Sequence, residues 1–354
     1  MNCIGIIGAG MIAHVHAEAA GAVGTNVVAV CDPRIEKANL FSEKYSCDLM
    51  NSVDELLERT DIEGVVIAVP NDQHASLAIR ALQAGKHVLL EKPMAMSVAE
   101  CESILEARDQ SGKILQLGFV CRYSPAAVQA KLCIEQGLIG EVCQIQATLL
   151  RQRGIPGLGG WFTTKERSGG GCLIDIGVHL IDVSMHITGL HAPVCASGIC
   201  QQLFSIDSYS YDEMWSSPIE NGIFDVEDRV LAMVRDISGT VFTYNVSWAT
   251  HLQEGALNDG LVIEGTKGSL TIDLWTDTIQ HGTSENGKSV THEINVEVTE
   301  PWDDAFQGEH RAFARAMRTG SVEHTAGTGE DGLLVQRVVD AIYESSSQQQ
   351  EVKI

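Results

Sequence analysis

Short apolar runs alternate with helical patterns from residue 3 to residue 120. The runs are apolar at nearly every position, which is typical of strands covered on both faces. Strict alternation of strand and helix implies right-handed crossovers and a parallel sheet. We therefore predict an α/β domain with a parallel, doubly wound sheet over residues 1–120. Its predicted strands are Cys3–Ile7, Val27–Cys31, Gly64–Ala68, His87–Leu90 and Ile114–Leu117, and its predicted helices are Met11–Ala22, Ile35–Lys44, His74–Ala84 and Val98–Asp109.

After Leu117 the pattern changes to successive strands joined by tight turns. Turn signals such as Ile237–Thr240 and Gly265–Gly268 separate the strands of region 194–297, which is typical of an antiparallel sheet. We predict a second domain over residues 121–354, of the α+β type with an open, mostly antiparallel sheet. Its other predicted elements are the strand Val142–Leu150 and the helices Ala126–Gln136, Cys172–Thr188, Asp303–Thr319 and Glu330–Ser346.

Composition indicates a globular, cytoplasmic protein. Hydrophobic residues make up 44% of the 354 residues and charged residues 20%, a balance unlike that of disordered chains. No apolar run approaches the roughly 18 to 20 residues that a membrane-spanning helix needs. The first predicted strand begins at Cys3, so we expect no export signal.

The formal charge of −23 repels nucleic acids and anionic membranes. It favours a small neutral substrate, such as a carbohydrate or glycoside. The ten cysteines, among them Cys3, Cys31, Cys143 and Cys195 in apolar stretches, contain no CxxC pair and no zinc spacing. We therefore expect buried, reduced thiols and no metal site.

A glycine-rich turn follows the first strand and opens the first helix. It reads Gly8-Ala-Gly10-Met11-Ile12-Ala13. The first glycine permits a tight turn, the second lets the backbone approach a pyrophosphate, and the helix N-terminus supplies N–H groups for the phosphates. The turn predicts a dinucleotide site; the alternative is a tight turn without a ligand.

Asp32 ends the second strand, where a carboxylate accepts the ribose hydroxyls of NAD and repels the 2′-phosphate of NADP. We predict NAD as cofactor, although Arg34 could pair with such a phosphate and Asp32 could instead cap the next helix. In open α/β sheets ligands lie at the carboxyl ends of strands. Pro70, Asn71 and His74 are therefore predicted to border the cofactor; alternatively Asn71 caps a helix and His74 only begins one.

Two motifs carry the predicted chemistry. Lys92, in Glu91-Lys92-Pro93, follows the fourth strand and could stabilise developing alkoxide charge beside the cofactor; a surface turn is the alternative. Asp175 and His179 are four residues apart on a predicted helix and share a face, so the carboxylate can orient an imidazole that moves protons. Structural hydrogen bonding, or an incomplete metal set with Asp182, are the alternatives.

The order and spacing of these motifs resemble one family, glucose–fructose oxidoreductase / inositol dehydrogenase / rhizopine catabolism (Gfo/Idh/MocA). The resemblance covers essentially the whole chain and rests on Gly8–Ala13, Val69–His74, Glu91–Pro93 and Gly169–Asp182. It implies a Rossmann domain, a second domain whose open sheet often mediates homo-oligomers, and a Lys92–Pro93 peptide that is often cis. It further implies that Lys92, Asp175 and His179 form the catalytic trio, with His179 or Lys92 as the acid/base.

Two segments depart from the family or add to it. After Gly118-Phe119 many relatives carry an Asn-Arg-Arg/Phe-like stretch, whereas this chain has Val120 where relatives often contact the cofactor; Arg122 and Tyr123 are expected to face the substrate. In the loop Arg151–Phe162, Trp161 could stack on a pyranose while Arg151 and Arg153 donate to hydroxyls, or the loop could simply be packed.

Relatives with a similar loop include dehydrogenases that oxidise glucosides or anhydrosugars at the ring C3 hydroxyl. The resemblance therefore implies NAD-dependent oxidation of a secondary hydroxyl of a sugar, glycoside or polyol, with ring C3 of a glucoside as the narrowest hypothesis. The alternatives are a glycosidase that oxidises transiently and eliminates, an inositol dehydrogenase, an aldose-type reductase and a non-catalytic NAD-sensing regulator.

Overall fold

The computed structural model describes residues 2–204, 211–212, 219, 221–253, 259–296 and 301–354. Its contacts divide the chain into two compact units, Met1–Val120 with Asp303–Leu333, and Cys121–Trp302 with Leu334–Ile354. The sequence placed every residue after 120 in the second domain. Residues 303–333 instead belong to the first unit, because Phe313, Ala316 and Met317 of helix α9 (Pro301–Thr319) pack into its hydrophobic core.

The first unit contains a six-stranded sheet in the order β3-β2-β1-β4-β5-β6. All of its paired strands are parallel. The strand order reverses between β1 and β4, which confirms the predicted doubly wound sheet and places its switch point beside the glycine turn. The strands are β1 (Cys3–Ile7), β2 (Asn26–Cys31), β3 (Asp48–Leu49), β4 (Gly64–Ile67), β5 (His87–Leu90) and β6 (Leu115–Leu117).

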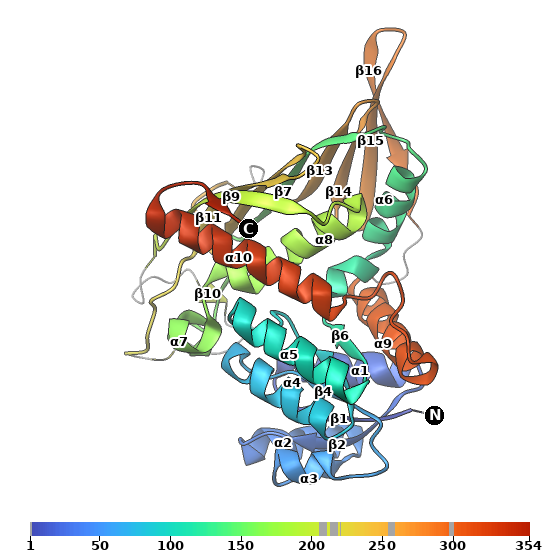
Figure 1. Ribbon diagram of the computed structural model, residues 1–354, viewed down its shortest axis with the longest axis vertical. Coiled ribbons are helices and arrows are strands. Elements are labelled where there is room, and N and C mark those ends of the chain that lie inside the picture. Colours follow the sequence, from blue (N-terminus) through green and yellow to red (C-terminus); the bar gives the residue numbers. More distant parts are fainter. Residues whose placement is uncertain (1, 205–210, 213–218, 220, 254–258, 297–300) are drawn as a thin grey trace. The chain divides into compact units, whose positions relative to one another are not determined.

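The helices of this unit begin close to their predicted positions. Helices α4 and α5 lie side by side (Figure 1). The sequence missed β3 and α3, because two and five residues are too short to show a period. Besides α9, the helices are α1 (Met11–Ala22), α2 (Ile35–Tyr45), α3 (Val53–Leu57), α4 (His74–Gln83) and α5 (Val98–Ser111), with a 3-10 turn, η1, at Asn71–Gln73.

The second unit contains a nine-stranded sheet in the order β16-β15-β14-β13-β7-β12-β11-β9-β17. Within this nine-stranded sheet, only β7 and β12 pair in parallel among the described residues, so the prediction of an open, mostly antiparallel sheet is confirmed. The strands are β7 (Val142–Leu150), β9 (Pro193–Gln201), β11 (Arg229–Asp236), β12 (Val241–Ser247), β13 (Gly260–Gly265), β14 (Ser269–Asp273), β15 (Thr278–Glu285), β16 (Lys288–Ile294) and β17 (Val352–Lys353); β8 (Ile155–Pro156) pairs separately with β10 (Tyr211–Asp212). Parts of the predicted strand region, 205–210, 213–218 and 254–258, lie outside the described residues.

Helices of the second unit pack against this sheet. Helix α8 contacts β7, and α6 contacts β14 (Figure 1). The helices are α6 (Pro125–Glu135), α7 (Lys165–Ser168), α8 (Val178–Thr188) and α10 (Gly329–Gln348), with 3-10 turns η2 (Val120–Tyr123) and η3 (Trp161–Thr163) and a π-helical turn η4 (Leu173–Gly177).

One helical stretch, Lys165–Thr188, is apolar and long enough to cross a membrane by length and composition alone, with a mean hydropathy of 1.3. Its C-terminal part is the predicted helix Cys172–Thr188, whose apolar residues are interrupted by Asp175, His179 and Asp182. In the structure 89% of its apolar window is buried. This burial is that of a core helix.

The ten cysteines are free thiols, and most of them are buried as expected. Cys143 is exposed, which corrects the expectation for that residue. It lies near the start of β7, where the register with β13 is irregular: Glu264 pairs with Gln144 and Gly265 pairs with Val142, so the pairing skips Cys143.

Candidate active site

The glycine turn of the first unit has the geometry of a phosphate site. Gly8 has a φ of +104°, and a Cβ at this residue would clash with the carbonyl oxygen of Ala68, so only glycine fits. A Cβ at Gly10 would meet nothing within 4 Å. No side chain caps α1 at Gly10, whose neighbours Met11 and Ile12 are at least partly exposed. The helix N-terminus is therefore open to a pyrophosphate.

Asp32 is buried at the carboxyl end of β2, directly after the strand. Its Oδ2 accepts the backbone N–H of Ala9 at 2.8 Å, and its Oδ1 accepts the backbone N–H of Arg34 at 2.8 Å. The Arg34 guanidinium donates to both oxygens at 3.0 Å. Burial opposes the charged form, but the hydrogen bonds from Arg34 and Ala9 outweigh it and lower the pKa of Asp32. Asp32 is therefore a carboxylate that also holds Arg34.

His74 joins two loops at the carboxyl edge of the sheet. Its Nδ1 lies 2.7 Å from the carbonyl oxygen of Pro93, and its Nε2 lies 3.0 Å from that of Val69. Both ring nitrogens are thus occupied by backbone groups, and the side chain is buried. Burial lowers the pKa of His74. His74 therefore joins the loops that contain Val69 and Pro93.

The Glu91-Lys92-Pro93 turn is held by its own glutamate. Glu91 Oε2 accepts the backbone N–H of Lys92 at 3.0 Å, while Oε1 lies 2.9 Å from His16 Nε2. Glu91 is buried and Lys92 is partly exposed. The Lys92–Pro93 peptide bond is cis, as the resemblance implied. The sequence did not single out His16, which lies on α1.

In the second unit Asp175 and His179 are partly exposed on an otherwise buried helix. Asp175 lies in the π-helical turn η4, and His179 lies in the first turn of α8, so the regular α-helical spacing expected between them is interrupted. The indole Nε1–H of Trp248 donates to Asp175 Oδ2 at 2.9 Å. Trp248 follows β12, and no sequence pattern linked it to Asp175.

Glu227 and its hydrogen-bond partner Tyr343 lie against the glycines Gly170 and Gly171, which precede this helix. The Glu227 carboxylate accepts the backbone N–H groups of Gly171 at 2.9 Å and Leu173 at 3.0 Å, and the Tyr343 hydroxyl donates to it at 2.9 Å. A Cβ at Gly171 would clash with the Glu227 carbonyl oxygen, and one at Gly170 with the Tyr343 hydroxyl. Burial raises the pKa of Glu227 despite these hydrogen bonds. Glu227 thus anchors the start of the Asp175 helix.

Arg122 and Asp182 form a buried ion pair, with side-chain exposures of 3% and 1% and a shortest separation of 2.6 Å. The guanidinium contacts both carboxylate oxygens. Arg122 therefore ties η2 to α8. Within the described residues no group of three His, Cys, Asp or Glu side chains is arranged to hold a metal ion. Tyr123, beside Arg122, is partly exposed.

The loop after β7 is partly packed and partly open. Trp161 stacks on Phe162, with ring centroids 3.8 Å apart, and keeps part of its surface exposed. Arg153 is exposed and its backbone bridges to Ala249. The Arg151 side chain lies against Gly154. The loop thus contains both packed side chains and exposed ones, as expected for either a structural or a substrate-binding loop.

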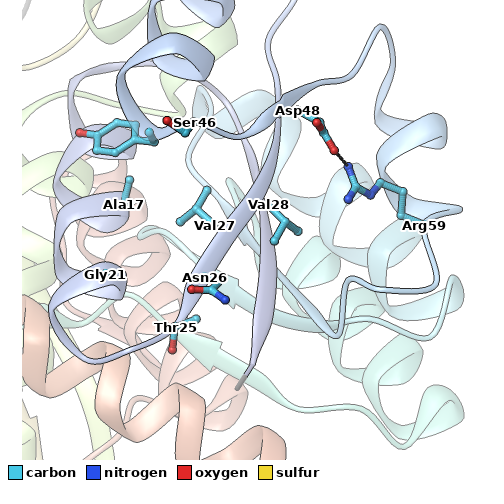
Figure 2. A pocket seen from close by; sticks show the side chains of 10 residues that line it. Ala17, Gly21, Thr25, Asn26, Val27, Val28, Ser46, Asp48 and Arg59 are labelled. Atoms are coloured by element: carbon cyan, nitrogen blue, oxygen red, sulfur yellow. Dashed lines mark hydrogen bonds and ion pairs between the residues drawn. The ribbon is translucent and has the colours of Figure 1, made fainter.

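A cavity of about 520 Å³ in the first unit is lined by Asn26, Val27 and Val28 at the amino-terminal end of β2 (Figure 2). Arg59 and Asp48, also in its lining, form an ion pair at 2.6 Å. The predicted cofactor residues lie at the opposite, carboxyl ends of the strands and line no part of it. This cavity is therefore separate from the predicted site.

The comparisons with known proteins agree with this geometry. Residues 3–119 match the Gfo/Idh/MocA oxidoreductase family's NAD-binding Rossmann fold, and residues 131–354 match its C-terminal alpha/beta domain. D-glucoside 3-dehydrogenase of Escherichia coli K12 is 27% identical over 356 residues, which cover 97% of this chain and 95% of that protein. Inositol 2-dehydrogenase of Rhizobium meliloti 1021 is 25% identical over 365 residues, which cover 99% and 98%.

Among solved structures, levoglucosan dehydrogenase in complex with NADH and levoglucosan has the same fold, with a TM-score of 0.88 at 23% identity over 100% of this chain and 99% of that one. The predicted family, fold class and NAD cofactor are confirmed. The chain belongs to the Gfo/Idh/MocA oxidoreductase family and is an NAD-dependent oxidoreductase of the kind that acts on sugar and polyol hydroxyl groups.

Proposed function

We propose that this protein is a dehydrogenase that oxidises a secondary hydroxyl of a sugar or glycoside, at ring C3 of a glucoside. The observation that carries the proposal is a pair of partly exposed ionisable side chains, Asp175 and His179, on a helix that is otherwise core, with Asp175 fixed by Trp248. Burying a polar or ionisable side chain costs free energy unless it is hydrogen-bonded or paired, so such residues on a core helix call for an explanation. The full-length similarity to D-glucoside 3-dehydrogenase supports the choice of substrate.

The cofactor residues in this proposal surround the carboxyl edge of the first unit's sheet. The bound nicotinamide supplies the hydride acceptor. Asp32 accepts ribose hydroxyls, and the open N-terminus of α1 at Gly10 receives the pyrophosphate. His74 and Glu91 shape the adjoining loops. The cofactor set is Gly8, Gly10, Met11, Ile12, Asp32, Pro70, Asn71, His74, Glu91 and Lys92.

Lys92, Asp175 and His179 form the catalytic group of this proposal. His179 accepts the hydroxyl proton while Asp175 orients its imidazole. Lys92 holds the reacting oxygen through its ammonium group and stabilises the negative charge that develops there. Lys92 belongs to the first unit and the other two belong to the second.

The substrate pocket is proposed to draw on the second unit. Trp161 offers a partly exposed ring to a pyranose face, and Tyr123, Arg151 and Arg153 donate to hydroxyls. Arg122 acts through its ion pair with Asp182, by holding the helix that carries His179.

We also propose a cytoplasmic homo-oligomer that assembles through the sheet of the second unit. Ile199, Leu231 and Met233 are 58%, 44% and 43% exposed on neighbouring strands β9 and β11. Large apolar side chains gathered on one open face are typical of an interface.

A substrate panel tests the proposal. The purified protein is incubated with NAD and inositols, aldoses, anhydrosugars, and O- or C-glucosides, and NADH formation is followed by absorbance. Oxidation of glucosides, with the product identified by NMR as the 3-ketone, supports the proposal. Preferential oxidation of inositols would support the second candidate, an inositol 2-dehydrogenase, which the Rhizobium relative favours. Aglycone release without net NADH would indicate the glycosidase alternative.

Lys92→Ala tests the catalytic group. It should lower kcat by on the order of 100-fold or more, since electrostatic stabilisation of the reacting oxygen is lost, with NADH affinity nearly unchanged. Retained activity would remove Lys92 from the mechanism.

A further inference from the structure

Four buried ionisable side chains of the first unit lie close together beside the Glu91-Lys92-Pro93 turn, and one of them, Glu91, belongs to this turn. They are His16 on α1, Glu91 after β5, and Glu309 and His310 on α9. His16 and Glu309 are 0% exposed and His310 is 1% exposed. Ionisable groups are buried together at a cost in free energy, and such clusters are frequent beside functional sites.

A continuous chain of hydrogen bonds connects three of them to Lys92. His310 Nε2 lies 3.0 Å from His16 Nδ1, and His16 Nε2 lies 2.9 Å from Glu91 Oε1. Glu91 Oε2 then accepts the backbone N–H of Lys92 at 3.0 Å. The chain therefore runs from α9 through α1 to the backbone of the proposed catalytic lysine.

The positions of the protons follow from hydrogen-bond satisfaction. His310 Nδ1 is buried and has no hydrogen-bond partner among the described residues, so a proton there would leave an orphaned donor. The proton of His310 therefore lies on Nε2 and is donated to His16 Nδ1. His16 in turn carries its proton on Nε2 and donates it to Glu91. Both imidazoles are neutral, and Glu91 accepts as a carboxylate.

The electrostatics of the groups that face His16 agree with this assignment. Burial, together with His16, holds the pKa of His310 well below its ordinary value. Burial, together with Glu91, holds the pKa of Glu309 well above its ordinary value, which favours its neutral form; neither of its carboxyl oxygens has a hydrogen-bond partner among the described residues. Glu309 Oε2 lies 4.0 Å from His16 Nδ1, outside hydrogen-bond distance.

We propose that His16 and His310 are positioning residues, two neutral imidazoles of fixed tautomer that hold the Glu91 carboxylate and, through it, the backbone from which the Lys92 side chain projects. The role of Lys92 in this inference rests on the proposed function. The hydrogen-bond chain and its tautomers do not rest on it, and they can be tested without a substrate.

The first test is ¹⁵N NMR of the full-length protein labelled at histidine, near neutral pH. The His16 and His310 signals are assigned by their loss in His16→Gln and His310→Gln. Both should be neutral Nε2–H imidazoles. Glu91→Gln should switch both to Nδ1–H, because its amide oxygen stays with the Lys92 N–H and its NH₂ turns His16 Nε2 into an acceptor. An Nδ1–H or imidazolium His16 in the wild type, or unchanged tautomers in Glu91→Gln, would overturn the proposal.

The second test compares two substitutions of similar size on the substrate that the panel identifies. His16→Gln keeps an N–H near the Nε2 position, whereas His16→Leu fills the space with no donor. His16→Leu should lower kcat by roughly 10- to 100-fold and His16→Gln by about threefold at most, since small displacements of catalytic groups are costly. NADH affinity, measured by fluorescence, should be the same in both.

A pH profile separates positioning from packing. Without its donor the Glu91 carboxylate is easier to protonate, so the acid limb of kcat should move to higher pH in His16→Leu and stay in place in His16→Gln. Equal kcat and identical acid limbs in the two variants would overturn the proposal. If no compound in the panel is oxidised, the proposed function fails while the NMR result still decides the tautomers.

Discussion

Replacing Trp248 with phenylalanine removes one hydrogen-bond donor from the Asp175 carboxylate and keeps an aromatic ring in the core. The indole Nε1–H donates to Asp175 Oδ2 at 2.9 Å, and Trp248 is fully buried. A hydrogen bond to a charged group contributes about 1.5–3 kcal/mol. Since about 1.4 kcal/mol corresponds to a tenfold change in rate, Trp248→Phe should lower kcat/KM by roughly 10- to 150-fold.

The assay compares kcat/KM and Tm of this variant with those of Tyr244→Phe. Tyr244 is also buried, and its hydroxyl lies 3.1 Å from that of Ser184, so the control removes a polar contact at Ser184 and leaves Asp175 untouched. Both variants should lose about 1–2 kcal/mol of stability, and only Trp248→Phe should lose activity. If Trp248→Phe folds and keeps kcat/KM within about threefold of wild type, the reasoning about Asp175 is refuted.

Gly10→Ala should leave Tm unchanged, because a Cβ there meets open space, yet weaken NADH binding in a fluorescence titration by roughly tenfold or more, because it obstructs the pyrophosphate; wild-type affinity would contradict this. Asp32→Asn should raise the ratio of kcat/KM for NADP to that for NAD by roughly tenfold, since the carboxylate that repels a 2′-phosphate is lost; an unchanged ratio would count against it. Burial raises the pKa of Glu227, so the native state binds more protons than the unfolded state and stability falls as pH rises from the ordinary carboxyl pKa toward the raised value. Urea unfolding should show a shallower fall in Glu227→Gln, and equal slopes would argue against the assignment.

The fold was largely predictable because its evidence is local. Strands β1 and β5 begin and end at the predicted residues. The positive φ of Gly8 belongs to a tight turn formed by residues adjacent in sequence, so the glycine itself indicates it. Helix α9 was predicted as a helix but not as part of the first unit. Its apolar face is visible in the sequence, while the core that accepts Phe313 is made by residues some 300 positions earlier.

Site residues that lie in contiguous motifs could be predicted from the sequence. Contacts between residues far apart in the chain could not. Lys92, Asp175 and His179 lie within short contiguous motifs, so they can be identified as candidate residues from the sequence alone. Trp248 lies 73 residues from its partner Asp175, and no spacing rule connects an indole to a carboxylate at that distance. The sequence predicted that Arg122 faces the substrate, and only the structure showed that its guanidinium pairs with the buried carboxylate of Asp182.

The sequence by itself determined the alternation of strands and helices, the glycine turn at Gly8–Ala13 and the carboxylate at the end of the second strand, Asp32, because each depends on the period or the backbone of neighbouring residues. Only the tertiary structure decided which groups support the chemistry. His16 meets His310 across 294 residues of chain. Hydrogen bonds of that kind depend on how buried elements pack against one another, and packing leaves no periodic pattern along the chain.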